Sequence, residues 1–391
     1  MTKKKHFRVV VLGAGFARPA GLLLADELFA EIRSRATIQY GFTNAIESDL
    51  EYFITYKQRC EGTQISKENV DYEEFLGFFD VEHALGFRGG DTITSEGNQT
   101  QLIAKKLIGQ IIYEKMPKCP ESIPTLYLDF ARRLQPSDWV LTFNYDTLLE
   151  RALEAVGTPF RRFPIRYKEV HPRLGYGVSD DSQDEVVVLK LHGSIDWFDR
   201  TPYDEAKNAL ATVDPNCEPR WYSHFSPDSE FEMTPLLEGI QMPDDPLHRI
   251  HRMVNYDSYY SQSHIPQPPF ILTPSSGKVL YFEALKPLWW GIGEAGGLNL
   301  GMTIIGYSVP PHDEHARQAV YRLTDNYTGF EPNLELGGIR KSPLKLLNLA
   351  HHKHETQLFK SRYRFVNWDR TEAWLDGFNK ESLDFIFGKG C

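Results

Sequence analysis

Two side chains suited to binding hydroxyl groups and moving protons each follow an apolar, strand-like run. Asn144 comes directly after the run 139–143, and His192 comes directly after the run 186–191. An asparagine amide both donates and accepts hydrogen bonds, so Asn144 is suited to holding a hydroxyl group or a water molecule. A histidine has an ordinary pKa of about 6.5 and accepts a proton at neutral pH, so His192 is a candidate general base.

The local sequence predicts which elements hold Asn144 in place. The run before it is typical of a buried central strand, and the leucine spacing after it is typical of a helix. Thr147 and Glu150 fit a capping box, which predicts that the helix begins within one residue of Thr147. Asn144, Tyr145 and Asp146 therefore lie between the carboxyl end of a strand and the amino end of a helix. In open α/β sheets this edge is where ligands bind.

A glycine turn lies near the amino terminus. The apolar run 7–12 ends at Gly13 and Gly15, and a helical pattern follows over residues 22–32. A strand, a glycine turn and a helix form the first unit of nucleotide-binding folds, because glycine lets the backbone approach a phosphate or ribose closely. Arg18 occupies the third glycine position of the G-x-G-x-x-G pattern, so this turn taken alone fits an ordinary tight turn equally well.

Polar or glycine-rich strand ends occur four times in the chain. They are Gly13-Ala14-Gly15, Asn144-Tyr145-Asp146, His192-Gly193 and Gly306-Tyr307-Ser308. Taken singly, Asn144 or Asp146 also fits a helix cap, and His192 fits a half-buried histidine whose hydrogen bonds are satisfied. The carboxyl ends of parallel strands meet at one edge of a sheet, so the four together predict a single pocket.

The order of the elements predicts an α/β fold with a Rossmann-like parallel sheet. We expect residues 1–335 to form the main domain, with a helical insertion at about 43–133 between the first two strands. The irregular segment at about 199–268 is long for a loop, so we expect it to contain short elements, such as a lid over the site. Residues 336–391 are expected to form a small C-terminal extension.

Positive charge dominates the segment 338–364, and three histidines lie inside it, at positions 351, 352 and 354. No helical or strand spacing places all three on one face, so an exposed basic loop is favoured over a metal site. A final strand over 363–368 and a final helix over 371–378 are predicted to close the chain.

The composition is that of a soluble globular protein, with 41% hydrophobic and 25% charged residues in a chain of 391. A net charge of −10 disfavours non-specific binding to nucleic acid. The four cysteines lie far apart without a Cys-x-x-Cys pair, so a zinc module is not expected, and their sparseness suits a reducing compartment. Without a signal sequence or a membrane-spanning run, we expect the protein in the cytoplasm.

The ordered motifs resemble the sirtuin-like fold of NAD-consuming enzymes, and most of all the bacterial sirtuin-like domains of anti-phage defence systems. The motifs are GAG at 13–15, TFNYD at 142–146, LHG at 191–193 and GYS at 306–308. The longer stretches 190–197 and 305–313 look like that branch rather than the protein deacylases. The resemblance covers about residues 7–325, and it is the set that is specific rather than any single motif.

This resemblance implies an NAD hydrolase that cleaves the nicotinamide–ribose bond and releases ADP-ribose and nicotinamide. It implies catalytic roles for Asn144, His192 and Asp146, the last holding the nicotinamide amide or orienting Asn144. The residues implied to bind NAD are Gly13, Ala14, Gly15, Phe16, Tyr145, Gly193, Gly306, Tyr307 and Ser308. No metal is implied.

The sequence departs from the family in three ways, and these leave other functions open. The paired cysteines of the deacylase zinc module are missing, Ala17 stands where the glycine loop often has serine, and the Asp-Phe-Arg element has no counterpart. The alternatives are an NAD-dependent protein deacylase, an NAD(P) oxidoreductase, and a non-catalytic scaffold that binds NAD or ADP-ribose. The missing cysteine pairs disfavour the deacylase.

The resemblance also implies partners, because an unrestrained NAD hydrolase would kill its host. Expected partners are further copies of the chain and either a HerA-type ATPase or a short Argonaute, in a system that causes abortive infection. The segments 338–364 and 221–260 are candidate contact surfaces. Neither direct nucleic-acid binding nor membrane binding is expected.

Overall fold

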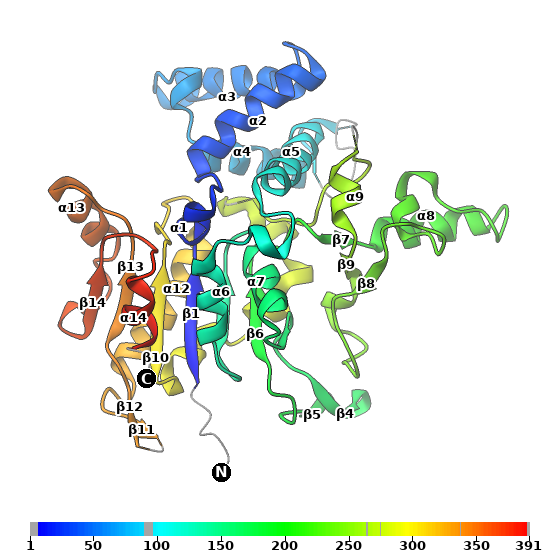
Figure 1. Ribbon diagram of the computed structural model, residues 1–391. Helices are drawn as coiled ribbons and strands as arrows, with labels where there is room; N and C mark the ends of the chain where they lie inside the picture. Colours follow the sequence, from blue (N-terminus) through cyan, green and yellow to red (C-terminus); the bar gives the residue numbers. More distant parts are fainter. Residues whose placement is uncertain (1–6, 90–96, 263–264, 274, 337, 389–391) are drawn as a thin grey trace.

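The computed structural model describes residues 7–89, 97–262, 265–273, 275–336 and 338–388. Its centre is a parallel sheet with the strand order β14-β13-β10-β1-β2-β6-β3 (Figure 1). The strands are β1 (Arg8–Leu12), β2 (Trp139–Thr142), β3 (Phe160–Arg161), β6 (Val186–Lys190), β10 (Gly301–Ile305), β13 (Leu344–Leu347) and β14 (Thr371–Trp374). Helices cover both faces of this sheet, which confirms the predicted α/β, Rossmann-like fold.

The helices are α1 (Ala14–Ala17), α2 (Ala25–Tyr40), α3 (Ala45–Glu61), α4 (Tyr72–Ala84), α5 (Gln99–Lys115), α6 (Thr125–Arg133), α7 (Leu148–Val156), α8 (Thr201–Ala211), α9 (Tyr256–Tyr260), α10 (Lys286–Trp289), α11 (Ala295–Leu298), α12 (Glu314–Gly329), α13 (Lys353–Arg362) and α14 (Ser382–Phe387). Two short hairpins lie outside the sheet, β4 (Tyr167–His171) with β5 (Tyr176–Ser179) and β11 (Glu335–Leu336) with β12 (Ile339–Arg340).

Strand β1 is central. The chain adds strands first on one side of it and then on the other, so the strand order reverses beside β1. Leu12 pairs in parallel register with Thr142 of β2 on one side and with Ile305 of β10 on the other. The chain builds β2, β3 and β6 on the first side and then crosses to build β10, β13 and β14 on the second. In open α/β sheets ligands bind at such a switch point, outside the carboxyl ends of the strands.

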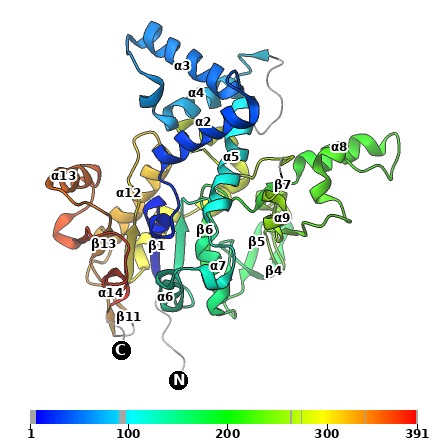
Figure 2. The same cartoon turned by 45° about the horizontal axis from the view of Figure 1, so that its top comes forward.

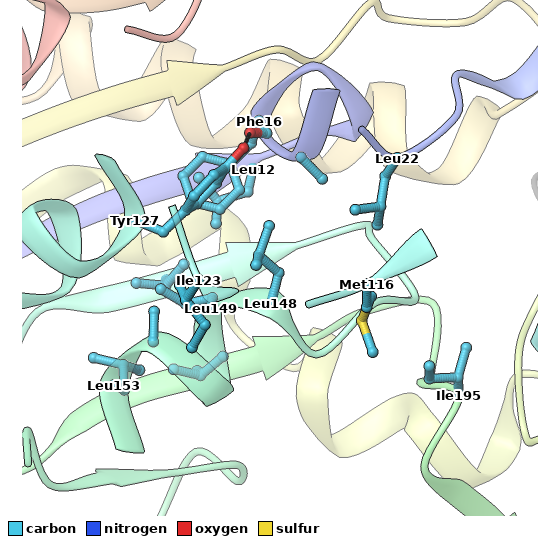
Figure 3. Packing of buried hydrophobic residues seen from close by; sticks show 14 of the residues in the cluster. Leu12, Phe16, Leu22, Met116, Ile123, Tyr127, Leu148, Leu149, Leu153 and Ile195 are labelled. Atoms are coloured by element: carbon cyan, nitrogen blue, oxygen red, sulfur yellow. Dashed lines mark hydrogen bonds between the residues drawn. The ribbon is translucent and has the colours of Figure 1, made fainter. Parts of the chain in front are cut away.

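Alternate residues of the central strands enter two separate cores, because successive side chains of a strand point to opposite faces. Val10 and Leu12 pack with α6, α7 and α14, whereas Val9 and Val11 pack with α12. Figure 3 shows part of the first core, in which Tyr127 of α6 lies beside the central strand. The two cores fix the strand register and therefore the position of each strand end.

Helices α2 to α5 form a layer over the carboxyl edge of the sheet (Figures 1 and 2). The layer has its own core, which includes Phe29, Phe53, Phe75 and Leu107 from these four helices. Ile271, from the segment that follows β9, is buried in the same core and ties the layer to the strand ends. The helical content expected between the first two strands is confirmed, and α2 belongs to the same layer.

The segment predicted to be irregular contains a small antiparallel sheet. Its strands are β7 (Trp197–Asp199), β8 (Met233–Pro235) and β9 (Ile250–Met253), in the order β7-β9-β8. The expected short elements are therefore present. Helix α8 extends away from the carboxyl edge in both views (Figures 1 and 2), and a lid over the site stays a prediction.

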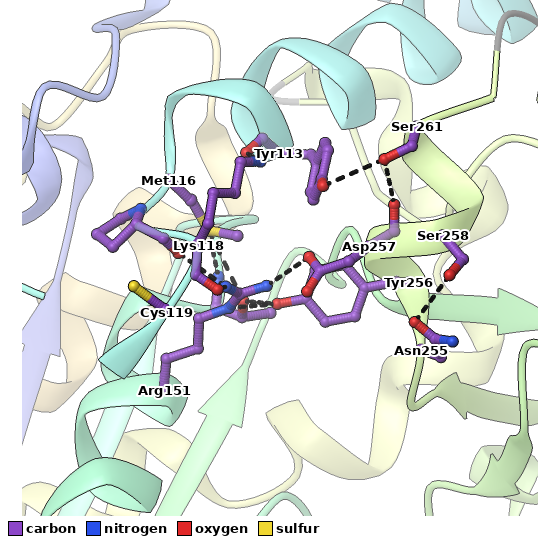
Figure 4. Close-up of polar contacts among 12 residues, drawn as sticks. Tyr113, Met116, Lys118, Cys119, Arg151, Asn255, Tyr256, Asp257, Ser258 and Ser261 are labelled. Carbon is purple, nitrogen blue, oxygen red and sulfur yellow. Dashed lines mark hydrogen bonds and ion pairs between the residues drawn. The ribbon is translucent and has the colours of Figure 1, made fainter. Parts of the chain in front are cut away.

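The end of this segment nearest the helical layer is tied down by Arg151 of α7 (Figure 4). Its guanidinium donates to the Tyr256 hydroxyl at 2.7 Å, to the Asp257 carboxylate at 2.9 Å and to the Pro117 carbonyl at 2.7 Å. One side chain thus connects α7, α9 and the chain that follows α5.

The C-terminal segment predicted as an extension is continuous with the main sheet, since β13 and β14 add two parallel strands to it. The predicted strand over 363–368 is wrong, because Phe359 and Tyr363 lie one helical turn apart and are both buried against the sheet. Helix α13 occupies the preceding residues, and β14 begins where a final helix was predicted. Within the described residues, no helix has the length and apolar content needed to cross a membrane.

Candidate active site at the carboxyl edge of the sheet

The glycine turn after β1 packs against the chain that leaves β10. The N–H groups of Gly13 and Gly15 donate to the carbonyls of Ile305 and Gly306, each at 2.9 Å. A Cβ atom at Gly13 would lie 2.5 Å from the Tyr307 Cα, and one at Gly15 would lie 2.7 Å from the Gly306 Cα. The two glycines are therefore required by the close approach of two strand ends, and their N–H groups already have acceptors within the chain.

Ala14 and Phe16, the other two predicted NAD contacts in this turn, have opposite environments. Ala14 is exposed at the start of α1. The Phe16 ring is 1% exposed and packs in the core beside Tyr127 (Figure 3). It also contacts the Phe378 ring. Helix α1 turns the Phe16 ring toward the core, so only the backbone of Phe16 is placed to contact NAD, and that contact stays a prediction.

Asn144 lies against the glycine turn, as the sequence predicts. Its side-chain amide donates to the Gly13 carbonyl at 3.1 Å, and its backbone N–H donates to the Thr142 hydroxyl at 3.1 Å. The side chain is half-buried. Since the Gly13 contact uses only the amide nitrogen, the Asn144 carbonyl oxygen remains as an acceptor at the switch point.

Asp146 is a helix cap in this structure. Its carboxylate accepts a hydrogen bond from the Leu148 N–H at 3.1 Å, and its carbonyl accepts one from the buried ammonium of Lys190. Burial raises the pKa of Asp146, and the charge of Lys190 opposes that shift. The structure therefore gives Asp146 a structural role at the start of α7, and its predicted catalytic role stays a prediction.

The predicted helix start is confirmed, but the predicted capping box is wrong. Helix α7 begins at Leu148 with Thr147 as its N-cap residue, and the Thr147 side chain makes no capping hydrogen bond. The Thr147 hydroxyl contacts the Tyr256 hydroxyl at 2.6 Å instead, and Glu150 forms an ion pair with Lys190 at 3.0 Å. The Asp146 carboxylate instead accepts from the Leu148 N–H at the helix start, as a capping aspartate does.

His192 lies at the end of β6 among aromatic rings and buried charges. Its ring is 5.0 Å from that of Phe143 and 6.1 Å from that of Trp289, between centroids. Its Nε2 atom is 2.8 Å from the Lys278 ammonium and 3.4 Å from a carboxylate oxygen of Asp313. Lys278 and Asp313 also form a direct ion pair. All three residues are buried: His192 is 3% exposed to solvent, Lys278 0% and Asp313 1%.

Burial and charge together determine how these three groups ionise. Burial, reinforced by the Lys278 charge, lowers the pKa of His192 to about 3. Burial likewise lowers the pKa of Lys278, although Asp313 opposes that shift. Burial alone would raise the pKa of Asp313, but the neighbouring His192 and Lys278 outweigh burial and lower it. The cluster is therefore a neutral imidazole beside an ammonium–carboxylate pair.

Gly193 and Tyr145 connect these strand ends to the segment 270–272. Gly193 has a φ of +82°, and a Cβ atom there would overlap the Phe270 carbonyl oxygen. The Leu272 N–H donates to the His192 carbonyl at 2.8 Å, and the Tyr145 hydroxyl donates to the Leu272 carbonyl at 2.7 Å. Gly193 is thus a packing requirement, and Tyr145 positions the chain beside His192.

The last predicted strand end, after β10, forms the other wall of the switch point. Gly306 has a φ of +63° and lies against Gly15, and the next positive φ, at Val309, is +52°. The Tyr307 ring is 5% exposed and 4.8 Å from that of Phe143, whereas Ser308 is exposed. No described residue is a hydrogen-bond partner of the Tyr307 hydroxyl.

Lys278, Asp313 and Glu73 belong to this site but were not assigned from the sequence. Asp313 ends the stretch 305–313, and Lys278 lies 35 residues before it, but spacing alone does not pair residues so far apart. Glu73 lies in the first turn of α4. It is half-buried, and burial, with the charges of Asp313 and Asp71, raises its pKa to about 8.

We expect Glu73→Gln to reduce the loss of stability at alkaline pH. A carboxyl group with a raised pKa stabilises the fold fully below its ordinary pKa, and this contribution is lost as pH rises through the raised value. The wild type should therefore lose stability between pH 5 and pH 9, and the variant should lose on the order of 2 kcal/mol less, allowing for partial exposure. Thermal unfolding across that range measures the difference.

Glu74→Gln is the matched control, because Glu74 forms an ion pair with Lys57 at 2.6 Å instead. Equal pH dependence in wild type and Glu73→Gln would contradict the placement of Glu73 beside the buried cluster.

Two cavities lie away from these residues. One, of about 310 Å³, is at the amino ends of β1 and β10 and is lined by Arg8, Thr303 and Lys345 among others. The other, of about 510 Å³, lies in the helical layer near Asn44 and Arg88. The chemistry-bearing residues are concentrated at the carboxyl edge, so we assign the candidate site there on residue chemistry and topology rather than cavity size.

Comparisons with known proteins are consistent with part of this assignment. No curated protein matches the chain. Solved structures that align with it include those described as "The Structural basis of Sirtuin Substrate Affinity" (13% identity, TM-score 0.32, covering 99% of this chain and 96% of that one) and "Structural Basis for the Mechanism and Regulation of Sir2 Enzymes" (13%, 0.28, 98% and 91%).

A family model described as a SIR2-like domain matches residues 138–277, a little over a third of the 391 residues. The matched range contains β2 and β6 and ends one residue before Lys278. The part of the chain that carries Asn144 and His192 is therefore similar to the SIR2-like domain family.

Proposed function

We propose that this chain binds NAD at the switch point and hydrolyses its nicotinamide–ribose bond. The observation that carries the proposal is the contact between the Asn144 amide and the Gly13 carbonyl, at 3.1 Å, beside the strand end that bears His192. An amide, an imidazole and a glycine turn thus share one edge of the sheet. The match of residues 138–277 to a SIR2-like domain supports the choice of NAD over other nucleotides.

The polar groups without partners at this edge fit a dinucleotide. The hydroxyls of Tyr72 and Tyr307 are buried and have no hydrogen-bond partner among the described residues. A buried polar group without a partner costs about 1–3 kcal/mol, so such groups are candidates to meet a ligand. Ala14 and Ser308 are exposed on the two sides of the switch point and offer backbone and hydroxyl groups to the phosphates and the second ribose.

In the proposed reaction, water attacks the ribose carbon as the bond to nicotinamide breaks, giving ADP-ribose, nicotinamide and a proton. Nicotinamide leaves as a neutral molecule, so the site must chiefly stabilise the positive charge that develops on the ribose. Asn144 would hold a ribose hydroxyl or the attacking water through its carbonyl oxygen. His192 would accept the proton, once its Nε2 atom is released from Lys278.

Incubation of the purified chain with NAD tests the proposal by the release of nicotinamide. Release without any peptide supports hydrolysis, and release that needs an acylated peptide indicates a deacylase instead. A change in reduced-nicotinamide absorbance with an added substrate would indicate an oxidoreductase. Binding of NAD without loss over a long incubation, alone and with the product of the neighbouring gene, would indicate a scaffold and overturn the proposal.

We expect Tyr307→Phe to weaken NAD binding without destabilising the protein. The variant removes a buried hydroxyl that has no partner in the chain, so its free energy of unfolding should be unchanged or slightly higher. If the hydroxyl meets NAD, the dissociation constant measured by calorimetry should rise about tenfold, which corresponds to about 1.4 kcal/mol.

Tyr327→Phe is the control for that variant, because the Tyr327 hydroxyl donates to the Ser342 carbonyl at 2.5 Å, on another part of the sheet. It should lower stability by about 1 kcal/mol and leave NAD binding unchanged. Unchanged NAD binding in Tyr307→Phe would remove this residue from the site.

We further propose that the enzyme depletes NAD in the cytoplasm as an effector of anti-phage defence. This part rests on the motif resemblance, which also suggests self-association and a partner such as a HerA-type ATPase or a short Argonaute. Mass measurement of the purified chain, alone and after co-expression with its gene neighbours, tests both associations. Loss of cellular NAD only during phage infection would support the defence role.

A further inference from the structure

The ammonium of Lys278 occupies the nitrogen of His192 that catalysis would use. It lies 2.8 Å from the His192 Nε2 atom and forms an ion pair with Asp313, which caps helix α12 through the Ala316 N–H at 3.2 Å. Lys278 is 0% exposed and Asp313 is 1% exposed. The contact with the ring is therefore part of the site in the absence of substrate.

This contact determines which form of the imidazole is present. A lysine ammonium has three hydrogens to donate and no lone pair, so the Nε2 atom of His192 must be the acceptor. The ring proton is then on the Nδ1 atom, and the ring also hydrogen-bonds to the Phe143 backbone. His192 is therefore neutral even though the Asp313 carboxylate lies 3.4 Å away, a neighbour that by itself favours a charged imidazole.

The segment that carries Lys278 is held in place by polar contacts of its own. Asp80 of α4 accepts hydrogen bonds from the Ser275 and Gln101 side chains. A Cβ atom at Gly277 would lie 2.5 Å from the Asp80 Cβ, so this segment approaches α4 closely. The position of Lys278 is thus built from α4, α5 and the segment 275–281.

Burying a lysine and an aspartate together is seldom needed for stability, because well-packed apolar residues serve as well or better. Perturbed ionisable groups that gather at a ligand edge are more typical of functional sites. The cluster lies at the carboxyl edge of β6 and at the start of α12, both of which border the switch point.

We propose that Lys278, fixed by Asp313, is a positioning residue that keeps His192 neutral and ready to act as a base in the proposed NAD hydrolysis. The inference rests on that proposed function. Since the Nε2 atom has a single lone pair, substrate must take the place of the lysine N–H before His192 accepts a proton. Lys278 therefore also masks the base while substrate is absent.

The protonation of His192 depends on the charged groups around it. Lys278 on the segment 275–281, with Asp313 and His315 at the start of α12, acts on His192 directly. Glu73 and Asp80 on α4 act on Lys278. Removing the lysine leaves Asp313 as the nearest charge to the ring. The Lys278→Met variant should therefore turn a His–Lys contact into a His–Asp pair, in which the imidazole is charged at neutral pH.

Nitrogen NMR of histidine-labelled protein tests this without NAD. The chain has 13 histidines, and His192→Gln assigns the relevant signal. In the wild type the His192 ring should remain neutral from pH 8 down to pH 5. In Lys278→Met its titration should move up by at least two pH units, whereas Lys278→Arg, which retains a cationic donor, should behave like the wild type. Wild-type titration near the ordinary pKa, or an unchanged ring in Lys278→Met, would overturn the proposal.

Lys341→Met is the control for the loss of a buried lysine. Lys341 is 5% exposed and donates to the carbonyls of Gly297 and Phe330, away from the site. It should leave the His192 titration unchanged, and a shift equal to that of Lys278→Met would count against a specific role for Lys278.

The pH profile of kcat/KM for nicotinamide release is the second readout. Lys278→Met should lose at least tenfold in activity at pH 7 and recover part of it by pH 9, while Lys278→Arg keeps the wild-type profile. A loss that is equal at every pH indicates a structural role and overturns the proposal. If neither the wild type nor any variant releases nicotinamide, the proposed NAD hydrolysis fails. The NMR titration then still decides whether Lys278 controls the protonation of His192.

Discussion

Asn144→Ala should reduce nicotinamide release from NAD by about a hundredfold or more while the protein remains folded. A positioned polar group that acts on the reacting atoms is typically worth this factor or more. The variant removes the side chain that donates to the Gly13 carbonyl, and with it the acceptor oxygen at the switch point. We expect the loss mainly in kcat, because Asn144 is proposed to act on the ribose or the attacking water rather than on the adenine half of NAD.

Stability must be separated from catalysis in this test. Losing the hydrogen bond to Gly13 should cost about 1 kcal/mol of unfolding free energy. Asn44→Ala is the matched control, because Asn44 caps α3 by accepting from the Glu47 N–H at 3.2 Å and lies in the helical layer. It should cost a similar amount and leave the turnover of NAD unchanged. Wild-type turnover by Asn144→Ala would exclude Asn144 from the proposed mechanism.

The sheet was predictable because each of its inner strands is an apolar run that ends abruptly. The runs before Asn144, His192 and Gly306 are buried on both faces, and such runs are visible in a sequence without knowledge of their neighbours. The strand ends could then be placed at one edge, since parallel strands share their direction. The contact between Asn144 and Gly13 confirms that step.

The charged cluster could not be predicted, because its members are joined only by the fold. Lys278 is 86 residues from His192 and 35 residues from Asp313 along the chain. No periodicity relates such positions. Lys278 lies in a short 3-10 helix and Asp313 is the N-cap residue of α12, and a charged residue is ordinary at both. The stretch 305–313 is conspicuous in the sequence, but only the packing of α4 and α12 over the strand ends reveals the partners of Asp313 and Lys278.

Gly13 and Gly15 lie where the sequence predicts a close approach to the backbone, but the group that approaches is not the predicted one. Gly13 and Gly15 were expected to let a phosphate approach the backbone. In the structure they let the Gly306 backbone approach, and Gly306 in turn would bring a Cβ atom within 2.5 Å of Gly15. A sequence shows that a close approach is needed, but it does not show whether a ligand or another strand end makes that approach.

The start of α7 shows a local capping pattern that loses to an ion pair with a distant residue. The Thr-x-x-Glu pattern predicted that Thr147 and Glu150 cap α7. Glu150 pairs instead with Lys190, which is buried and needs an anionic partner, so the helix end is left to Asp146. The buried lysine on the neighbouring strand, 40 residues away in the sequence, therefore overrides the local pattern.

Gly193→Ala should be the most destabilising single substitution at the site, by about 3 kcal/mol or more. A non-glycine residue at the observed φ of +82° costs about 1–2 kcal/mol. The added Cβ atom would also overlap the Phe270 carbonyl oxygen, and the backbone there cannot easily move because Leu272 donates to the His192 carbonyl at 2.8 Å. Overpacking of this kind costs about 1–3 kcal/mol more.

Gly157→Ala separates the two contributions to that loss. Gly157 also has a positive φ, +71°, at the C-terminal end of α7, but an added Cβ atom would meet nothing within 4 Å. The control should therefore show only the backbone strain, and the urea midpoint should fall much further in Gly193→Ala. Equal shifts would mean that the segment 270–272 does not press against the strand end. Because that segment aligns the chain at His192, we expect any folded Gly193→Ala protein to lose nicotinamide release as well, whereas Gly157→Ala should retain it.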